Sequence, residues 1–96
     1  SKSLEDAGVF AIVLECVERL TSKEITETIK IPTIGIGSSS FCDGQILVTD
    51  DLLGLTDTKI KFVKKYTNLK SNVRNAVKKF KLDVKSGSYP SAKYSY

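Results

Sequence analysis

The sequence predicts an α/β fold in which short parallel strands alternate with helices. The first sign is the uninterrupted apolar run over residues 9–14, which is typical of a strand covered on both faces by helices. The second is that further short apolar runs follow, separated by segments with helical spacing. A length of 96 residues with 41% hydrophobic and 27% charged side chains fits one small globular domain.

The first elements can be read in order along the chain. Residues 3–7 have the pattern of a last helical turn that ends at Gly8, and the apolar strand follows at once. Thr21 and Glu24 then have the spacing of a capping box. We therefore expect a helix over about residues 22–29.

Two more strands are expected, over about residues 33–37 and 45–49. The earlier one contains Gly35 and Gly37, which permit close approach of backbone or ligand. Connections between parallel strands are almost always right-handed, so the three strands are expected to form successive βα units.

The rest of the chain has a helical pattern and a strong positive charge. We expect one or two helices, over about residues 61–69 and 71–84, and then a polar tail over residues 86–96. Residues 1–58 carry a net charge of −6, whereas residues 59–96 carry +10. A basic nucleic-acid-binding module is one interpretation of that charge.

The spacing of the cations favours a plainer interpretation. Apolar positions recur at helical intervals, at Val73, Ala76, Val77, Phe80 and Val84. The cations between them then form the solvated face of an amphipathic helix: Lys70, Arg74, Lys78, Lys81 and Lys85. Because no aromatic platform or finger motif accompanies them, we expect no nucleic-acid partner.

Several classes of protein are excluded by what the chain lacks. Histidine is absent, which removes Ser-His and Cys-His catalysis and most zinc sites. Cys16 and Cys42 have no metal-type spacing and are expected to be reduced, mostly structural thiols. No apolar run reaches the roughly 18 to 20 residues that cross a bilayer, and the first residues do not have the pattern of a signal peptide. We expect no membrane partner and a cytoplasmic protein.

Glu15 is the candidate catalytic residue, because it ends the first strand without a local cation to pair with. Ligands bind at the carboxyl ends of parallel strands, where partial burial makes a carboxylate a better base. The alternative is a solvated, idle acid at a strand-to-loop junction.

More specific motifs occur in a fixed order: Leu14-Glu15-Cys16-Val17, Ile31-Pro32-Thr33-Ile34-Gly35-Ile36-Gly37, Cys42-Asp43-Gly44-Gln45-Ile46-Leu47-Val48, Asp51-Leu52-Leu53-Gly54-Leu55, Lys61-Phe62-Val63-Lys64-Lys65-Tyr66 and Asp83-Val84-Lys85-Ser86-Gly87-Ser88-Tyr89-Pro90. In order and spacing they resemble the C-terminal third of the ketopantoate hydroxymethyltransferase family, over essentially all 96 residues. The resemblance implies the last three βα units of a (β/α)8 TIM-type barrel, incomplete as a stand-alone chain.

The resemblance also implies an activity. Family members are oligomeric, magnesium-dependent enzymes of pantothenate biosynthesis. They transfer a hydroxymethyl group from 5,10-methylenetetrahydrofolate to the oxo acid 3-methyl-2-oxobutanoate, giving 2-dehydropantoate. Glu15 aligns with the general base that removes the C3 proton of that oxo acid.

The family's magnesium ligands and substrate-binding lysine lie on strands that precede the matched region. We therefore expect no magnesium site and no assigned substrate-binding residue here, and we expect the 96 residues to be inactive alone. Asp43, Asp50 and Asp51 are rejected as metal ligands, since their family counterparts do not bind the metal and paired acids near a turn are usually solvated. The chain is expected to need the remainder of the barrel or a homo-oligomer as its partner. A non-catalytic βα module that completes a barrel or oligomer in trans is the alternative.

The sequence departs from the family pattern at four places. Glu18 stands where a proline usually follows the Glu-Cys-Val element, and Ser38-Ser39-Ser40 replaces a small Ala-Gly continuation. Thr49-Asp50-Asp51 and Tyr94-Ser95-Tyr96 replace a His-Asp pair and a His-Ser-Phe ending. We expect a looser loop at Glu18 and added side chains beside the active site at residues 38–40.

Overall fold

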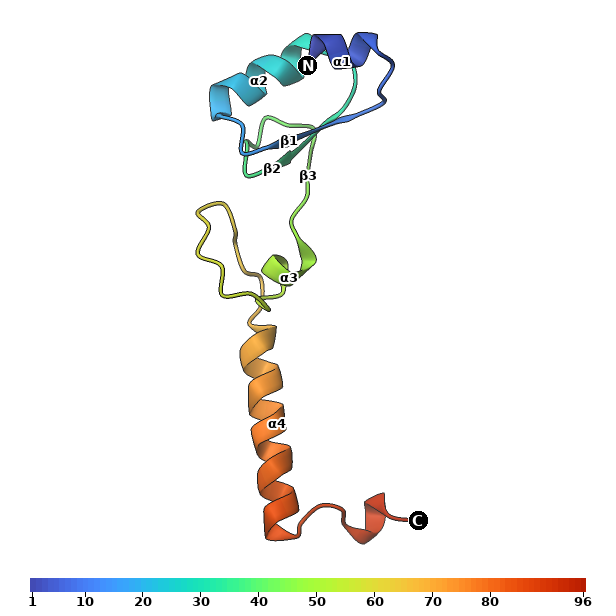
Figure 1. The fold of residues 1–96 in the computed structure, drawn as a ribbon, viewed down its shortest axis with the longest axis vertical. Helices are drawn as coiled ribbons and strands as arrows, with labels where there is room; N and C mark the ends of the chain where they lie inside the picture. Colours follow the sequence, from blue (N-terminus) through green and yellow to red (C-terminus); the bar gives the residue numbers. More distant parts are fainter. The chain divides into compact units, whose positions relative to one another are not determined.

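The computed structural model describes residues 1–96, which form two compact units. The first consists of Ser1–Val48 and Lys59–Lys64, and the second of Thr49–Thr58 and Lys65–Tyr96. Figure 1 labels the helices and strands: α1 (Lys2–Asp6), β1 (Ile12–Glu15), α2 (Arg19–Thr28), β2 (Thr33–Ile36), β3 (Gly44–Gln45), α3 (Thr49–Leu52) and α4 (Leu69–Ser86). A 3-10 helix, η1 (Ala92–Tyr94), follows near the end of the chain.

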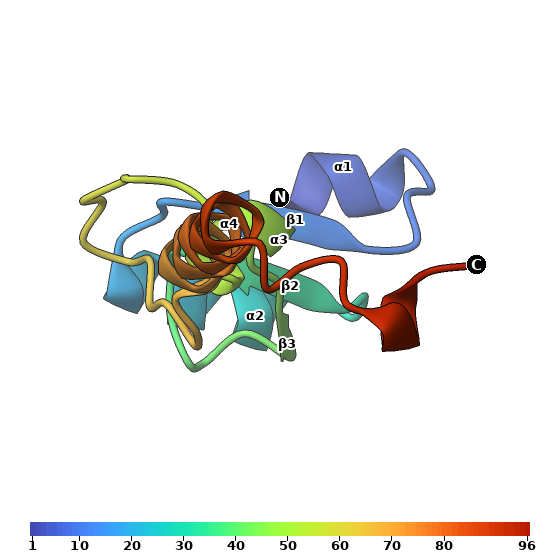
Figure 2. The ribbon, with the colours of Figure 1, turned by 90° about the horizontal axis from the view of Figure 1, so that it is seen from below.

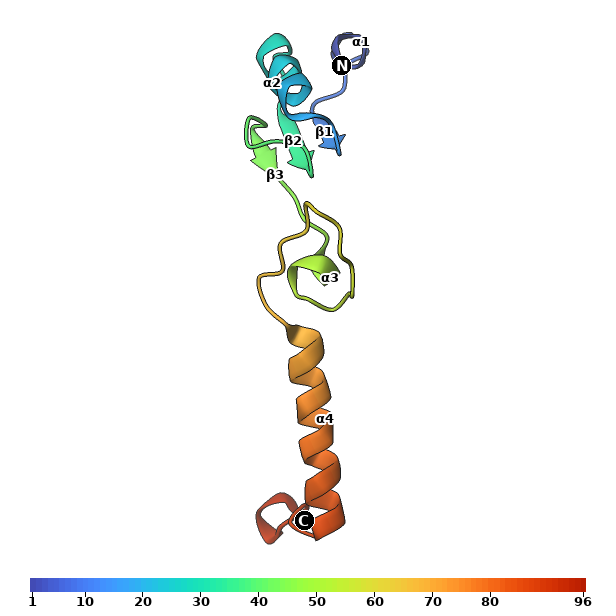
Figure 3. The ribbon, with the colours of Figure 1, turned by 90° about the vertical axis from the view of Figure 1, so that its left-hand side faces the viewer.

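The first unit is built on a three-stranded parallel sheet with the order β1-β2-β3. Glu15 of β1 pairs with Ile36 of β2, and Gly35 of β2 pairs with Gln45 of β3. Figure 3 shows the three arrows side by side and pointing in one direction. The α/β class that the sequence predicts is confirmed.

The core of this unit lies between the sheet and α2. Ile12 and Leu14 of β1 are buried with Ile29 and Cys42, and Val17, Ile25 and Ile31 pack against this cluster. The opposite face of β1 is open, and Val13 is 57% exposed. The expectation of a strand buried on both faces over residues 9–14 is therefore wrong. Only one face of β1 is covered in this chain, so burial alternates along Ile12–Glu15.

Two other predicted boundaries in the first unit differ from the structure. The helix expected over residues 22–29 begins at Arg19, because the Glu18 carboxylate caps it and accepts hydrogen bonds from the Leu20 and Thr21 amides at 3.0 Å. The capping box of Thr21 and Glu24 is not formed.

The strand expected over residues 45–49 is only Gly44–Gln45. The Ile46 amide makes a last hydrogen bond to the Gly35 carbonyl at 3.0 Å, and α3 begins at Thr49. The strand therefore ends earlier than expected, and Thr49, the last residue of the expected strand, begins a helical turn.

The helix expected over residues 61–69 is also wrong. Within the second unit, the amides of Tyr66 and Leu69 donate to the carbonyls of Leu52 and Leu53 at 2.9 Å, so they make no helical hydrogen bond to residues 61–65. A single helix, α4, then covers the residues 71–84 that were expected to be helical and extends beyond them at both ends.

Local interactions define the ends of α4. The Asn68 side chain accepts from the Ser71 amide at its start, and Gly87 ends it in the left-handed region at φ 77°. The tail then turns back, so that the Tyr89 ring meets Phe80 with 5.7 Å between centroids. In Figure 2, which looks nearly along α4, the tail leaves the end of the helix and carries η1. No side chain of α4 is buried.

Candidate active site

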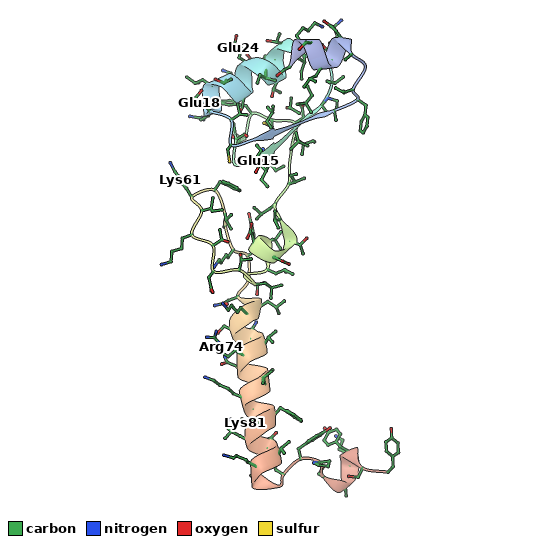
Figure 4. All side chains as sticks on the ribbon, in the orientation of Figure 1. Glu15, Glu18, Glu24, Lys61, Arg74 and Lys81 are labelled. Atoms are coloured by element: carbon green, nitrogen blue, oxygen red, sulfur yellow. The ribbon has the colours of Figure 1, made fainter.

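Glu15 is the last residue of β1, at the carboxyl edge of the sheet, where Figure 4 labels it. The expectation of a partly buried carboxylate is not met in this chain, because the side chain is exposed. Within these 96 residues the carboxylate makes no hydrogen bond and no ion pair.

The backbone beside Glu15 is held more tightly than its side chain. Cys16 lies in the left-handed region at φ 54°, which is uncommon for a residue other than glycine. Its amide donates to the Ile36 carbonyl at 3.0 Å. The Ser38 hydroxyl donates to the Leu14 carbonyl at 2.6 Å and accepts from the Val17 amide at 3.1 Å. The backbone on both sides of Glu15 is thus hydrogen-bonded to Ile36, at the end of β2, and to Ser38, which lies just beyond that strand.

A cleft of about 520 Å³ opens at the same edge, next to the ends of β2 and β3. Its lining residues are Gly37, Ser38, Ser39, Gln45, Lys61 and Phe62. Ligands of open parallel sheets bind at this edge, so the position of the cleft fits a binding site. Lys61 is its one charged lining residue and could attract an anionic group.

Gly35 of β2 and Gly37, which directly follows that strand, are approached by side chains of the chain itself. A Cβ at Gly37, where φ is 62°, would lie 2.6 Å from the Phe62 ring. One at Gly35 would lie 3.0 Å from the Cys42 sulfur. The sequence predicts close approach of backbone or ligand at these glycines, whereas in this chain the side chains of Phe62 and Cys42 make the close approach. Sequence reasoning missed Lys61 and Phe62 as lining residues, because their segment was expected to be a helix.

The aspartates considered as metal ligands have other partners or positions. Asp43 accepts from the Thr33 amide at 2.8 Å and from its hydroxyl at 3.3 Å. This contact lies at the amino end of β2, the edge opposite to Glu15, so Asp43 has a structural role. In the second unit, Asp50 and Asp51 lie in α3, and Asp51 accepts from the Thr56 hydroxyl at 2.7 Å.

No group of three His, Cys, Asp or Glu side chains comes together to hold a metal ion. The residues present therefore do not fit the magnesium site that the resemblance implies. Cys42 belongs to the core as expected, but Cys16 is an exposed free thiol and has no packing role. None of the helices has the length and apolar character required to cross a membrane.

Comparison with known proteins decides the family. A family model described as ketopantoate hydroxymethyltransferase matches residues 1–92. The chain belongs to this family. The motif resemblance found in the sequence is thereby confirmed, and members of the ketopantoate hydroxymethyltransferase family are hydroxymethyltransferases.

Curated relatives of the ketopantoate hydroxymethyltransferase family match along the whole chain. A protein from Pelagibacter ubique is 59% identical over 96 residues, which are all of this chain and 37% of its own length. One from Buchnera aphidicola is 51% identical over 94 residues, 97% of this chain and 36% of its length. One from Thermotoga maritima is 50% identical over 97 residues, which cover all of this chain and 36% of its length. Each is named 3-methyl-2-oxobutanoate hydroxymethyltransferase. The chain thus spans little more than a third of the relatives it matches.

Proposed function

We propose that this chain supplies the general base, Glu15, of a 3-methyl-2-oxobutanoate hydroxymethyltransferase. The enzyme would transfer a hydroxymethyl group from 5,10-methylenetetrahydrofolate to 3-methyl-2-oxobutanoate and give 2-dehydropantoate. The observation that carries the proposal is the place of Glu15, at the carboxyl edge of the sheet within the residues that match the family. The names of the relatives support the choice of substrate.

The first step of the reaction requires a base close to C3 of the oxo acid. The bond between C3 of the oxo acid and its hydrogen breaks, and the proton moves to the Glu15 carboxylate. The electron pair left behind forms the C2–C3 double bond, and the carbonyl electrons move to oxygen to give an enolate. An unpaired carboxylate on a fixed backbone suits this step, because no ion pair has to break before the proton is accepted.

The sheet fits a barrel of which it forms one part. The α2 helix packs on the face of β1 that carries Ile12 and Leu14, which would be the outer face of a (β/α)8 barrel. Val13 and Glu15 lie on the other face, which would line the barrel interior. The exposure of Val13, an apolar side chain in mid-strand, supports a complete barrel in which that face is covered.

The cofactors and the assembly belong to the same proposal. The folate donor would bind at the carboxyl edge of the complete barrel, and magnesium would take its ligands from residues outside this chain. The proton transfer assigned to Glu15 does not require a metal ligand from these 96 residues. We further propose an oligomeric, cytoplasmic enzyme, with these 96 residues inactive by themselves.

The test uses a chimera in which these residues replace the matching 96 residues of the Pelagibacter ubique relative. Exchange of the C3 proton of 3-methyl-2-oxobutanoate for deuterium, followed by NMR with magnesium and without folate, isolates the base-catalysed step. Glu15→Gln keeps the size of the side chain and removes the base, so exchange should fall by about 10² to 10⁴. Glu24→Gln, on the exposed surface of α2, makes the same change of charge and should leave the rate unchanged.

Two results would contradict the proposal. If the Glu15→Gln variant exchanges as fast as its parent, Glu15 is not the base. If the chimera folds and binds its substrate but does not exchange the proton, the chain acts as a non-catalytic βα module.

A further inference from the structure

The Ser38 side chain joins two segments that lie far apart in the sequence. Its hydroxyl donates to the Leu14 carbonyl at 2.6 Å and accepts from the Val17 amide at 3.1 Å. One side chain therefore bonds the backbone before and after the pair Glu15-Cys16. Both bonds cross more than 20 residues, and both are partly shielded from water.

This bridge encloses a strained turn. Cys16 has φ 54°, a conformation that costs free energy in a residue with a Cβ and persists only where the surroundings hold it. The Cys16 amide is bonded to Ile36, the partner of Glu15 in the sheet. Ser38 adds the restraints on Leu14 and Val17, so the turn is fixed at three points.

We propose that Ser38 is a positioning residue that fixes the direction in which Glu15 leaves the sheet. This inference rests on the proposed role of Glu15. Within these 96 residues Glu15 makes no hydrogen bond, so what they contribute to the direction of its carboxylate comes through its backbone, and the Ser38 bridge supplies that restraint. Loss of alignment by about 1 Å can cost a reaction up to 10²-fold, so a bridge of this kind has a measurable effect.

A side-chain bridge is useful here because residue 18 is a glutamate and not a proline. A proline at this position would restrict Val17 and stiffen the loop after Glu15. Glu18 lacks that restraint, and the Ser38 hydroxyl bonds the residue directly before it. The Glu18 backbone, at φ −55° and ψ 146°, can accept a proline. A proline at position 18 should therefore replace part of what Ser38 does.

The experiment uses the same chimera and the same exchange assay. Ser38→Ala should lower kcat for proton exchange by about tenfold and change KM for the oxo acid by less than about twofold, because alignment and not binding is lost. Ser38→Thr keeps the hydroxyl and should restore most of the rate. Ser40→Ala removes an exposed hydroxyl that has no hydrogen bond and does not line the cleft, so it should leave the rate unchanged.

A double-mutant cycle tests the link to position 18. In a Glu18→Pro background, Ser38→Ala should cost less than about threefold. Protection of the Val17 amide from hydrogen exchange should fall in Ser38→Ala and stay unchanged in Ser40→Ala, and this measurement does not depend on activity.

The outcomes separate the inference from the function on which it rests. If Glu15→Gln abolishes exchange while Ser38→Ala behaves like Ser40→Ala, the base assignment stands and the positioning role is wrong. A fall in kcat with unchanged Val17 protection would also overturn it, as would a loss that Ser38→Thr does not restore. If Glu15→Gln has no effect, the proposed function fails first.

Discussion

The two units differ in how their apolar side chains are used. Every buried hydrophobic side chain belongs to the first unit, where α2 packs on a face of the sheet. The second unit contains the longest helix, yet the apolar stripe of α4 is 50 to 60% exposed at its four largest positions, which are Val73, Val77, Phe80 and Val84. Figure 4 shows two of its cations, Arg74 and Lys81, along the length of the helix.

The difference teaches that an amphipathic pattern does not by itself bury a helix. Both α2 and α4 have such a pattern, but only α2 has a sheet within its own unit to pack on. Most helical stability in proteins comes from packing of the apolar face. In this chain α4 depends on its own length, on the Asn68 cap and on the turn at Gly87. The two units should therefore respond differently to the same change.

The largest difference in unfolding free energy is expected between two leucine-to-alanine substitutions, one in each unit. Leu14 is 5% exposed and Leu82 is 66% exposed. Leu14→Ala opens a cavity in the core and should lower the free energy of unfolding by about 2 to 5 kcal/mol. Leu82→Ala should cost close to nothing, since alanine favours the helix and no packing is lost. Urea denaturation followed by circular dichroism measures both. Equal losses would show that α4 is packed in solution and would remove the contrast.

A smaller effect is expected inside the second unit, at two glycines with positive φ. A Cβ at Gly54 would lie 2.2 Å from the Thr67 carbonyl oxygen, whereas one at Gly87 would meet nothing within 4 Å. Gly87→Ala should cost about 1 kcal/mol of backbone strain. Gly54→Ala carries that strain and also separates the backbone around Leu53 from Thr67, so its loss should be larger, about 1 to 3 kcal/mol. If the two variants have the same thermal midpoint, residues 52–54 do not pack on residues 66–69 in solution.

What the sequence predicts well in this chain is local. Apolar runs place β1 and β2, and helical spacing places α4, because each signal lies within a few neighbouring residues. The position of Glu15 at the end of a strand follows from the same local signal. Its role as a base stays a proposal.

What the sequence does not predict depends on partners far along the chain. The helix over residues 61–69 is replaced by bonds from Tyr66 and Leu69 to residues 52–53, which no local pattern reveals. The start of α2 is missed because a glutamate, an uncommon cap, takes the role of the usual serine or threonine. The Ser38 bridge is also missed because its partners are distant in the sequence, since its bonds reach residues more than 20 positions away.

A third contrast concerns how the stability of the first unit depends on pH. Hydrogen bonds from the Leu20 and Thr21 amides hold the pKa of Glu18 below its ordinary value. A carboxylate with a lowered pKa in the folded state adds stability above its unfolded pKa of about 4.3, and this stability is lost as the pH falls through the lowered pKa. Glu18→Gln should flatten the acid side of the stability curve, whereas Glu24→Gln, at an exposed position of α2, should leave it unchanged. Thermal midpoints measured between pH 7 and pH 3 check this. A curve that keeps its acid slope in Glu18→Gln would show that other carboxylates cause it.

The smallest effect is expected on the cationic face of α4. Lys70 pairs with Asp57 and holds the pKa of that aspartate below its usual range, whereas Lys78 has no ionic partner. Lys78→Ala should change the free energy of unfolding by no more than about 0.5 kcal/mol, because it removes a solvated charge from a helix that alanine also favours. Lys70→Ala should be the more destabilising of the two, and added salt should reduce its effect, since exposed ion pairs are screened. Urea denaturation at low and high salt compares them. A large loss of unfolding free energy in Lys78→Ala would mean that the Lys78 side chain makes stabilising contacts in solution. The solvated face predicted from the helical spacing would then be wrong.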